Sequence, residues 1–163
     1  MSIKEMEKNF QRVGAVSNAH VGRDFEESAR LLLASRGILV ESHFSVDIGV
    51  GNTKKPHLFD LGAGEPPTIV ECKSHRWTSG GNVPSAKLTV WNEAMFYFVC
   101  TPPNYRKIFF ALRDVRAGSN ETLVSYYLRT YSHLIPEDVE IWEYDEVENQ
   151  AEIVRAAQPN SRR

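Results

Sequence analysis

The segment from Thr68 to Ser74, TIVECKS, constrains the fold of this chain most. Its apolar residues are typical of a buried β-strand, whereas Glu71 and Lys73 are ionisable groups that are costly to bury. Residues two apart in a strand share a face, so Glu71 and Lys73 should point the same way and Cys72 into the opposite layer. The two charges therefore form either an ordinary ion pair or part of a reactive site.

The segments before this strand predict one long helix and two further strands. The helix has Ser17 or Asn18 as its N-cap and stops at Gly37. Strict alternation of apolar and polar residues predicts a strand over residues 44–50, and residues 57–62 form a short second strand. Turn sequences separate these strands from each other and from TIVECKS, so we expect a three-strand meander.

The segments after this strand predict alternating helices and strands. A helix starts at Pro84 and continues to about residue 99, and a strand covers residues 106–112. Asn120 can cap a further helix, and residues 137–145 read as the final strand. The order α-β-β-β-α-β, followed by α-β, predicts an α/β fold with a mixed β-sheet flanked by helices.

We expect all 163 residues to form a single domain. Residues 1–17 form an N-terminal helical arm, 18–112 the core, 113–157 a C-terminal extension and 158–163 a frayed tail. No apolar run suits a membrane span, and the N-terminus lacks the apolar core of a signal peptide. We therefore expect a cytoplasmic protein whose two cysteines, Cys72 and Cys100, are reduced core residues.

The charged residues of the meander suit metal-assisted chemistry. If the second and third strands pair, Asp60 comes near Glu71, and two close carboxylates repel each other unless a cation lies between them. Oxygen ligands favour Mg²⁺, Mn²⁺ or Ca²⁺ over zinc. Lys73 would then be a positive charge beside the metal, placed to meet a phosphate oxygen. This combination suits hydrolysis of a phosphodiester bond.

Asp60 followed by Glu71-Cys72-Lys73 resembles the motif of the PD-(D/E)xK nuclease superfamily, and the α-β-β-β-α-β order of residues 18–112 matches as well. The resemblance implies a restriction-endonuclease-like core in which Asp60 and Glu71 bind Mg²⁺ or Mn²⁺ and Lys73 is catalytic. It further implies that the Cys72 carbonyl is a metal ligand and that Glu26 of the first helix joins the catalytic acids. One departure is that the residue before Asp60 is phenylalanine rather than proline.

Other polar residues could contact a substrate or could be ordinary surface groups. A net charge of −2 argues against a protein that coats nucleic acid by bulk charge. Four basic residues are nonetheless candidates for binding a nucleic-acid backbone, although scattered solvated bases are an equally good interpretation: Lys54, Lys55, Arg76 and Lys87. His57 and His75 flank the acids and could orient water or contact phosphate, but we interpret them as ordinary surface groups rather than catalytic residues.

Three functions are compatible with these patterns. The first is a metal-dependent deoxyribonuclease, an endonuclease of restriction, repair or mobile-element type, acting on DNA as a homodimer. The second is a non-catalytic nuclease-fold module that binds DNA or a protein partner. The third is an unrelated α/β domain in which Glu71 and Lys73 form only an ion pair. The motif does not distinguish DNA from RNA, or endonuclease from exonuclease.

Overall fold

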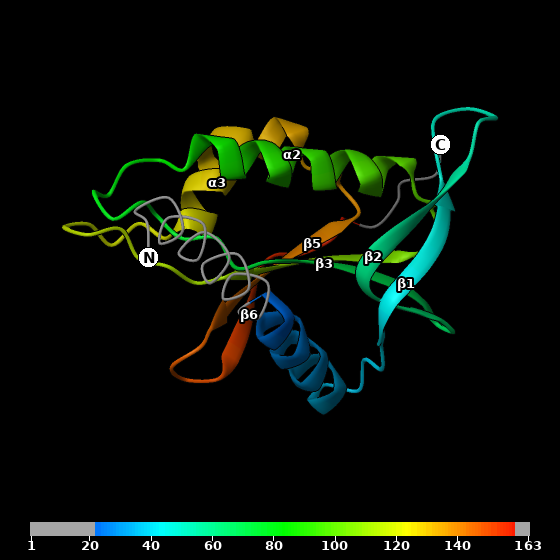
Figure 1. Ribbon diagram of the computed structural model, residues 1–163, viewed down its shortest axis with the longest axis horizontal. Coiled ribbons are helices and arrows are strands. Elements are labelled where there is room, and N and C mark those ends of the chain that lie inside the picture. Colours follow the sequence, from blue (N-terminus) through cyan, green and yellow to red (C-terminus); the bar gives the residue numbers. More distant parts are fainter. Residues whose placement is uncertain (1–21, 159–163) are drawn as a thin grey trace, which may run out of the picture.

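The computed structural model describes residues 22–158, which form an α/β fold with a six-stranded mixed sheet and helices on both faces (Figure 1). A first helix covers residues 22–35, and the further elements are β1 Glu41–Ile48, β2 Lys55–Gly64, β3 Pro67–Lys73, α2 Ser85–Cys100, β4 Arg106–Leu112, α3 Leu123–Tyr131, the 3₁₀ helix η1 Ser132–Leu134, β5 Val139–Asp145 and β6 Gln150–Arg155. The strands lie in chain order across the sheet.

The sheet combines two kinds of strand pairing. β1, β2 and β3 form an antiparallel meander, β4 and β5 continue it in parallel, and β6 returns antiparallel to β5. Parallel neighbours need crossover connections, and α2 and α3 supply the two crossovers. Both helices cover one face of the sheet, and the first helix covers the other face (Figure 1).

Each face of the sheet has its own hydrophobic core. On the side of α2 and α3, the fully buried rings of Trp91 and Phe109 pack edge to face with centroids 5.2 Å apart. On the opposite side, Phe25 and Ala29 of the first helix pack against Val70 and other strand residues. These helical residues recur at a spacing of four, which places them on one stripe. β3 is therefore buried from both sides, as its apolar sequence predicts.

The predicted order of elements is confirmed within the described residues, with corrections at the C-terminal end. The strand β6 was not predicted. The cap of α3 is Thr122 rather than Asn120, because Thr122 and Ser125 form a reciprocal capping box. The strand predicted over residues 44–50 is β1, which starts and ends earlier. The N-terminal arm and the proposed caps Ser17 and Asn18 lie outside the described residues.

None of the helices in residues 22–158 is long and apolar enough to cross a membrane. Cys72 and Cys100 are both free thiols, as predicted.

Gly62 of β2 allows the close approach of β1 near the predicted site. A Cβ atom at Gly62 would lie 2.6 Å from Cδ1 and 2.7 Å from Cβ of Phe44, so the Phe44 side chain and its backbone would have to move. We expect Gly62→Ala to lower the free energy of unfolding by about 1–3 kcal/mol, measured by denaturant unfolding. Gly64→Ala is the matched control, because a Cβ there meets nothing within 4 Å. Equal stability of the two variants would contradict the prediction.

Candidate active site

On either side of Asp60, the buried side chains of β2 point to opposite faces of the sheet. Phe59 is buried in the core beneath α2 and α3, whereas Leu61, two residues later, is buried in the core beneath the first helix. Residues two apart in a regular strand share a face, so the strand must twist sharply between them. Asp60 therefore lies at a local irregularity in the sheet, beside the third strand.

Asp60 is bound to β3 at the point where the two strands separate. The pairing of β2 with β3 runs from Gly64 to Leu61, and the same register would next place Asp60 opposite Glu71. The ladder ends before that pair, and the backbone N–H of Cys72 instead donates to Oδ2 of Asp60 at 2.7 Å. The carboxylate thus satisfies a backbone donor that the separating strands would leave unpaired.

The hydrogen bond to Cys72 gives Asp60 a structural role that can be measured separately from any catalytic role. Asp60→Ala should lower the free energy of unfolding by about 1–3 kcal/mol, because the Cys72 N–H loses its acceptor. Asp60→Asn keeps an acceptor oxygen and should lose much less, as measured by denaturant unfolding. If the two variants are equally stable, the hydrogen bond contributes nothing measurable.

Glu71 and Lys73 form a buried ion pair. Lys73 Nζ donates to Oε2 of Glu71 at 2.9 Å, and the side chains are 14% and 7% exposed for Lys73 and Glu71 respectively, so this is no pair on the rim of the sheet. Burial raises the pKa of Glu71, Lys73 acts against that shift, and Asp60 adds to it. Burial opposes the charged form of Lys73, but the Glu71 and Asp60 carboxylates outweigh it and raise the pKa of Lys73. Lys73 is therefore a fixed cation at neutral pH.

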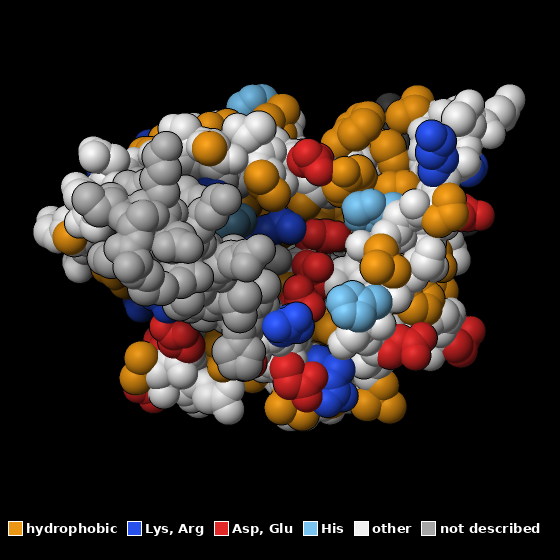
Figure 2. Space-filling view, viewed as in Figure 1, with side chains coloured by type: hydrophobic (Ala, Val, Ile, Leu, Met, Phe, Trp, Pro, Cys, Tyr) orange, Lys and Arg blue, Asp and Glu red, His pale blue; other side chains and the backbone are white. Residues whose placement is uncertain are grey.

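Glu26 of the first helix belongs to the same group of charges. Burial raises the pKa of Glu26, and the Asp60 and Glu71 carboxylates raise it further, while His43 and Lys73 lower it. The structure thus brings all four predicted catalytic side chains within electrostatic reach of one another. Figure 2 shows acidic side chains gathered at the centre of this face, with Lys or Arg and His side chains beside them.

The carboxylates suit a hard divalent cation in chemistry but are not arranged as a finished site. Within residues 22–158, no group of three or more His, Cys, Asp or Glu side chains is positioned to hold a metal ion. One oxygen of Asp60 accepts from Cys72 and one oxygen of Glu71 from Lys73, which leaves one oxygen of each for a ligand. The charge of Asp60 raises the pKa of both Glu26 and Glu71, and a bound cation would relieve this repulsion, so the donor set fits Mg²⁺ or Mn²⁺ in chemistry.

Cys72 contributes its backbone rather than its thiol. The side chain packs against the core beneath the first helix, as the alternation in β3 predicts. Burial, followed by the charges of Asp60 and Glu26, raises the pKa of the thiol well above its ordinary value. The thiol therefore stays neutral and is a poor nucleophile. The predicted role of the Cys72 carbonyl as a metal ligand stays a prediction.

The four basic residues predicted to contact nucleic acid come from three separate segments. Lys54 and Lys55 are exposed at the start of β2, where Lys54 Nζ donates to the carbonyl of Gly49 at 2.6 Å. Lys87 is exposed in the first turn of α2. Arg76 is instead paired with two carboxylates, Asp114 and Glu146. Nucleic-acid binding by these residues stays a prediction, and the pairing of Arg76 weakens its candidacy.

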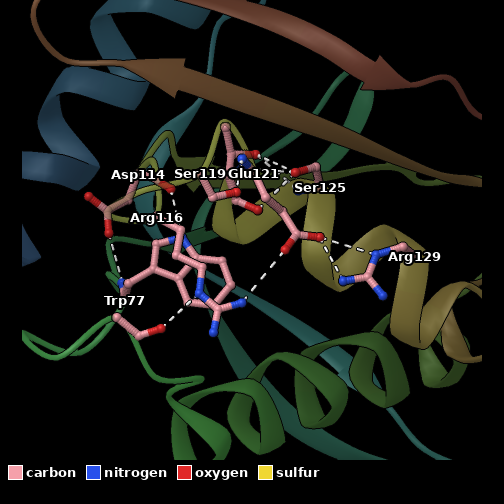
Figure 3. Close-up of polar contacts among 9 residues, drawn as sticks. Trp77, Asp114, Arg116, Ser119, Glu121, Ser125 and Arg129 are labelled. Atoms are coloured by element: carbon pink, nitrogen blue, oxygen red, sulfur yellow. Dashed lines mark hydrogen bonds and ion pairs between the residues drawn. The ribbon is translucent and has the colours of Figure 1, made fainter.

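The loop between β3 and α2 is held by the segment that follows β4 (Figure 3). Asp114 Oδ2 accepts from the backbone N–H of Trp77 at 2.7 Å, and the Asp114 carbonyl accepts from the indole N–H at 3.0 Å. Arg116 stacks over the Trp77 ring at 4.7 Å and donates from Nε to the carbonyl of Gly81 at 2.8 Å. The C-terminal extension thus fixes the loop that leaves the candidate site.

The interpretation of His57 and His75 as surface groups is wrong. The ring of His57 packs against Tyr97 of α2 with centroids 4.0 Å apart. His75 Nδ1 accepts a hydrogen bond from the indole N–H of buried Trp91 at 2.8 Å, and burial, with Lys73 and Lys87, lowers the pKa of His75 to about 4. The alternation of His57 with Phe59 in β2 was the available sequence signal for an inward histidine.

Comparison of the chain with protein-family models, with curated proteins and with solved structures returned no match.

Proposed function

We propose that this protein is a metal-dependent deoxyribonuclease of the PD-(D/E)xK type. One observation supports the proposal best: Asp60, Glu26, Glu71 and Lys73 come from three elements, and their charges act together on the pKa values of Glu26, Glu71 and Lys73 where β2 and β3 separate. The order of elements in residues 22–112 agrees with a restriction-endonuclease-like core. A motif in the right order on a matching fold is better support than either feature alone.

The acids would hold the cation and Lys73 would act on the substrate. Asp60 and Glu71, with Glu26 and the Cys72 carbonyl, would bind Mg²⁺ or Mn²⁺, which polarises a phosphoryl group and lowers the pKa of a bound water. Glu71 fixes the Lys73 ammonium through a 2.9 Å hydrogen bond, so the charge is in place before substrate arrives. A positioned ammonium stabilises the negative charge that develops on the phosphate during hydrolysis.

The proposed substrate is DNA and the proposed reaction is endonucleolytic. Cutting both strands of a duplex needs two sites, so the working form would be a homodimer. Exposed Lys54, Lys55 and Lys87 are the predicted contacts to the DNA backbone, where a positive charge binds phosphate without reading sequence.

One observation favours a second candidate function, a non-catalytic nuclease-fold module. All three motif residues already have internal partners, because Lys73 binds Glu71 and Asp60 binds the Cys72 N–H. In that case the charged residues serve to stabilise the separation of β2 from β3. Such a module would bind DNA or a protein partner without cutting.

A cleavage assay distinguishes the two functions. Supercoiled plasmid, linear duplex and single-stranded DNA are incubated with the protein and Mg²⁺, Mn²⁺ or EDTA. We expect metal-dependent nicking or linearisation of the plasmid, and its loss in Glu71→Gln. If the DNA stays intact with both cations but its mobility is shifted by the bound protein, the nuclease function is contradicted and the non-catalytic module is supported.

A further inference from the structure

The imidazole of His57 holds a buried nitrogen that needs a partner. Nε2 of His57 is inaccessible to solvent and makes no hydrogen bond within residues 22–158. The ring is held between Tyr97, with centroids 4.0 Å apart, and Phe59, with centroids 4.6 Å apart. Buried polar atoms in folded proteins are nearly always paired, so an unpaired one at a candidate site calls for a ligand.

The nitrogen that lacks a hydrogen bond lies at ion-pair distance from the second oxygen of Glu71. Oε2 of Glu71 accepts from Lys73, whereas Oε1 lies 3.5 Å from His57 Nε2 without forming a hydrogen bond. A cation about 2.1 Å from both atoms would see them at an angle of about 110°, close to a tetrahedral ligand angle. The spacing that is poor for a hydrogen bond therefore suits two ligands of one ion.

We infer that His57 Nε2 and Glu71 Oε1 bind the same divalent cation, and that His57 makes the site select a first-row transition metal over Mg²⁺. This inference rests on the proposed function, whose metal it specifies. Imidazole is a good ligand for transition metals, whereas Mg²⁺ prefers oxygen ligands and retains its water. The charge of Asp60 acts on Glu71, although residues 22–158 hold no ready-made group of three such ligands.

The test compares the binding of Co²⁺ and Mg²⁺ by the full chain. His57→Phe keeps an aromatic ring between Tyr97 and Phe59 but removes the nitrogen, and His57→Gln is a second variant in case the first misfolds. We expect His57→Phe to weaken Co²⁺ binding at least about tenfold in titration calorimetry and Mg²⁺ binding much less. The visible absorption of bound Co²⁺, which reports its ligands and geometry, should also change.

Two control variants make the result specific. His133→Phe removes another imidazole, exposed in η1, and should bind Co²⁺ as the wild type does. Glu71→Gln should weaken both cations. Co²⁺ binding that neither His57 variant alters would overturn the inference, and so would Co²⁺ binding that survives Glu71→Gln. If either of these results is found and the wild type still cuts DNA with Mg²⁺, the inference about His57 fails and the proposed nuclease function stands. If the wild type binds neither Co²⁺ nor Mg²⁺, both the inference and the proposed function fail.

Discussion

Replacing Lys73 with methionine should reduce the rate of DNA cleavage at least about a hundredfold, the effect of removing one preorganised charge from an active site. Methionine has a similar length and is apolar, so it can occupy the same space beside Glu71. DNA binding, measured by fluorescence anisotropy, should change little, since a single phosphate contact is a small part of the electrostatic attraction. The loss should therefore appear in the cleavage rate at saturating DNA and metal.

Lys107→Met is the matched control for this prediction. Lys107 is also a buried strand lysine, and its Nζ lies 2.6 Å from Asp138. It pairs with Ile69 at the start of β3, whereas Lys73 lies at the end of that strand. Both substitutions remove one partner of a buried ion pair and should destabilise the fold. Only Lys73→Met should lose cleavage per folded molecule, and equal activities of the two variants would show that Lys73 has a structural role alone.

Local sequence signals were enough to predict most of the fold. Gly37 has a φ of +78°, which suits the glycine that follows the end of the first helix. The strand β6 lacks such a signal, because only Ala151 of its six residues is buried. Residues 150–155 form a strand because β5 offers them an open edge for hydrogen bonding. That cause lies in the assembled sheet and cannot be read from the segment itself.

The sequence predicts the candidate site only in β3, where the alternation of inward and outward residues sets the direction of each side chain. The period of two in β3 correctly separates the Glu71 side chain from the Cys72 side chain. The position of Asp60 depends instead on the change of face in β2 and on a hydrogen bond to another strand. Likewise His57 is held against Glu71 by Tyr97 of α2, forty residues later in the chain. Tertiary packing decides both positions, so the alternation in the sequence fixes only the direction of the Glu71, Cys72 and Lys73 side chains.

Glu26→Gln should stabilise the metal-free protein at pH 8 while reducing DNA cleavage. The pKa of Glu26 is raised above 4.5 in the folded chain by burial and by Asp60. A raised pKa means that the folded state binds the proton more tightly, so stability falls as pH rises through the folded pKa and the loss is complete above it. The variant lacks this loss. Its melting temperature should exceed that of the wild type by a few degrees at pH 8 and match it at pH 4.

Glu27→Gln gives the opposite expectation on the same helix. Glu27 is exposed, and its hydrogen bond with Arg30 lowers the pKa of its carboxyl, so the substitution should leave the melting temperature unchanged or slightly lower at pH 8. A bound cation stabilises the folded protein, and Glu26→Gln removes one of the proposed ligands. Saturating Mg²⁺ should therefore raise the melting temperature of the wild type and of Glu27→Gln more than that of Glu26→Gln. If the difference in melting temperature between the two variants is the same in EDTA and in Mg²⁺, Glu26 is an ordinary half-buried acid and takes no part in holding the metal.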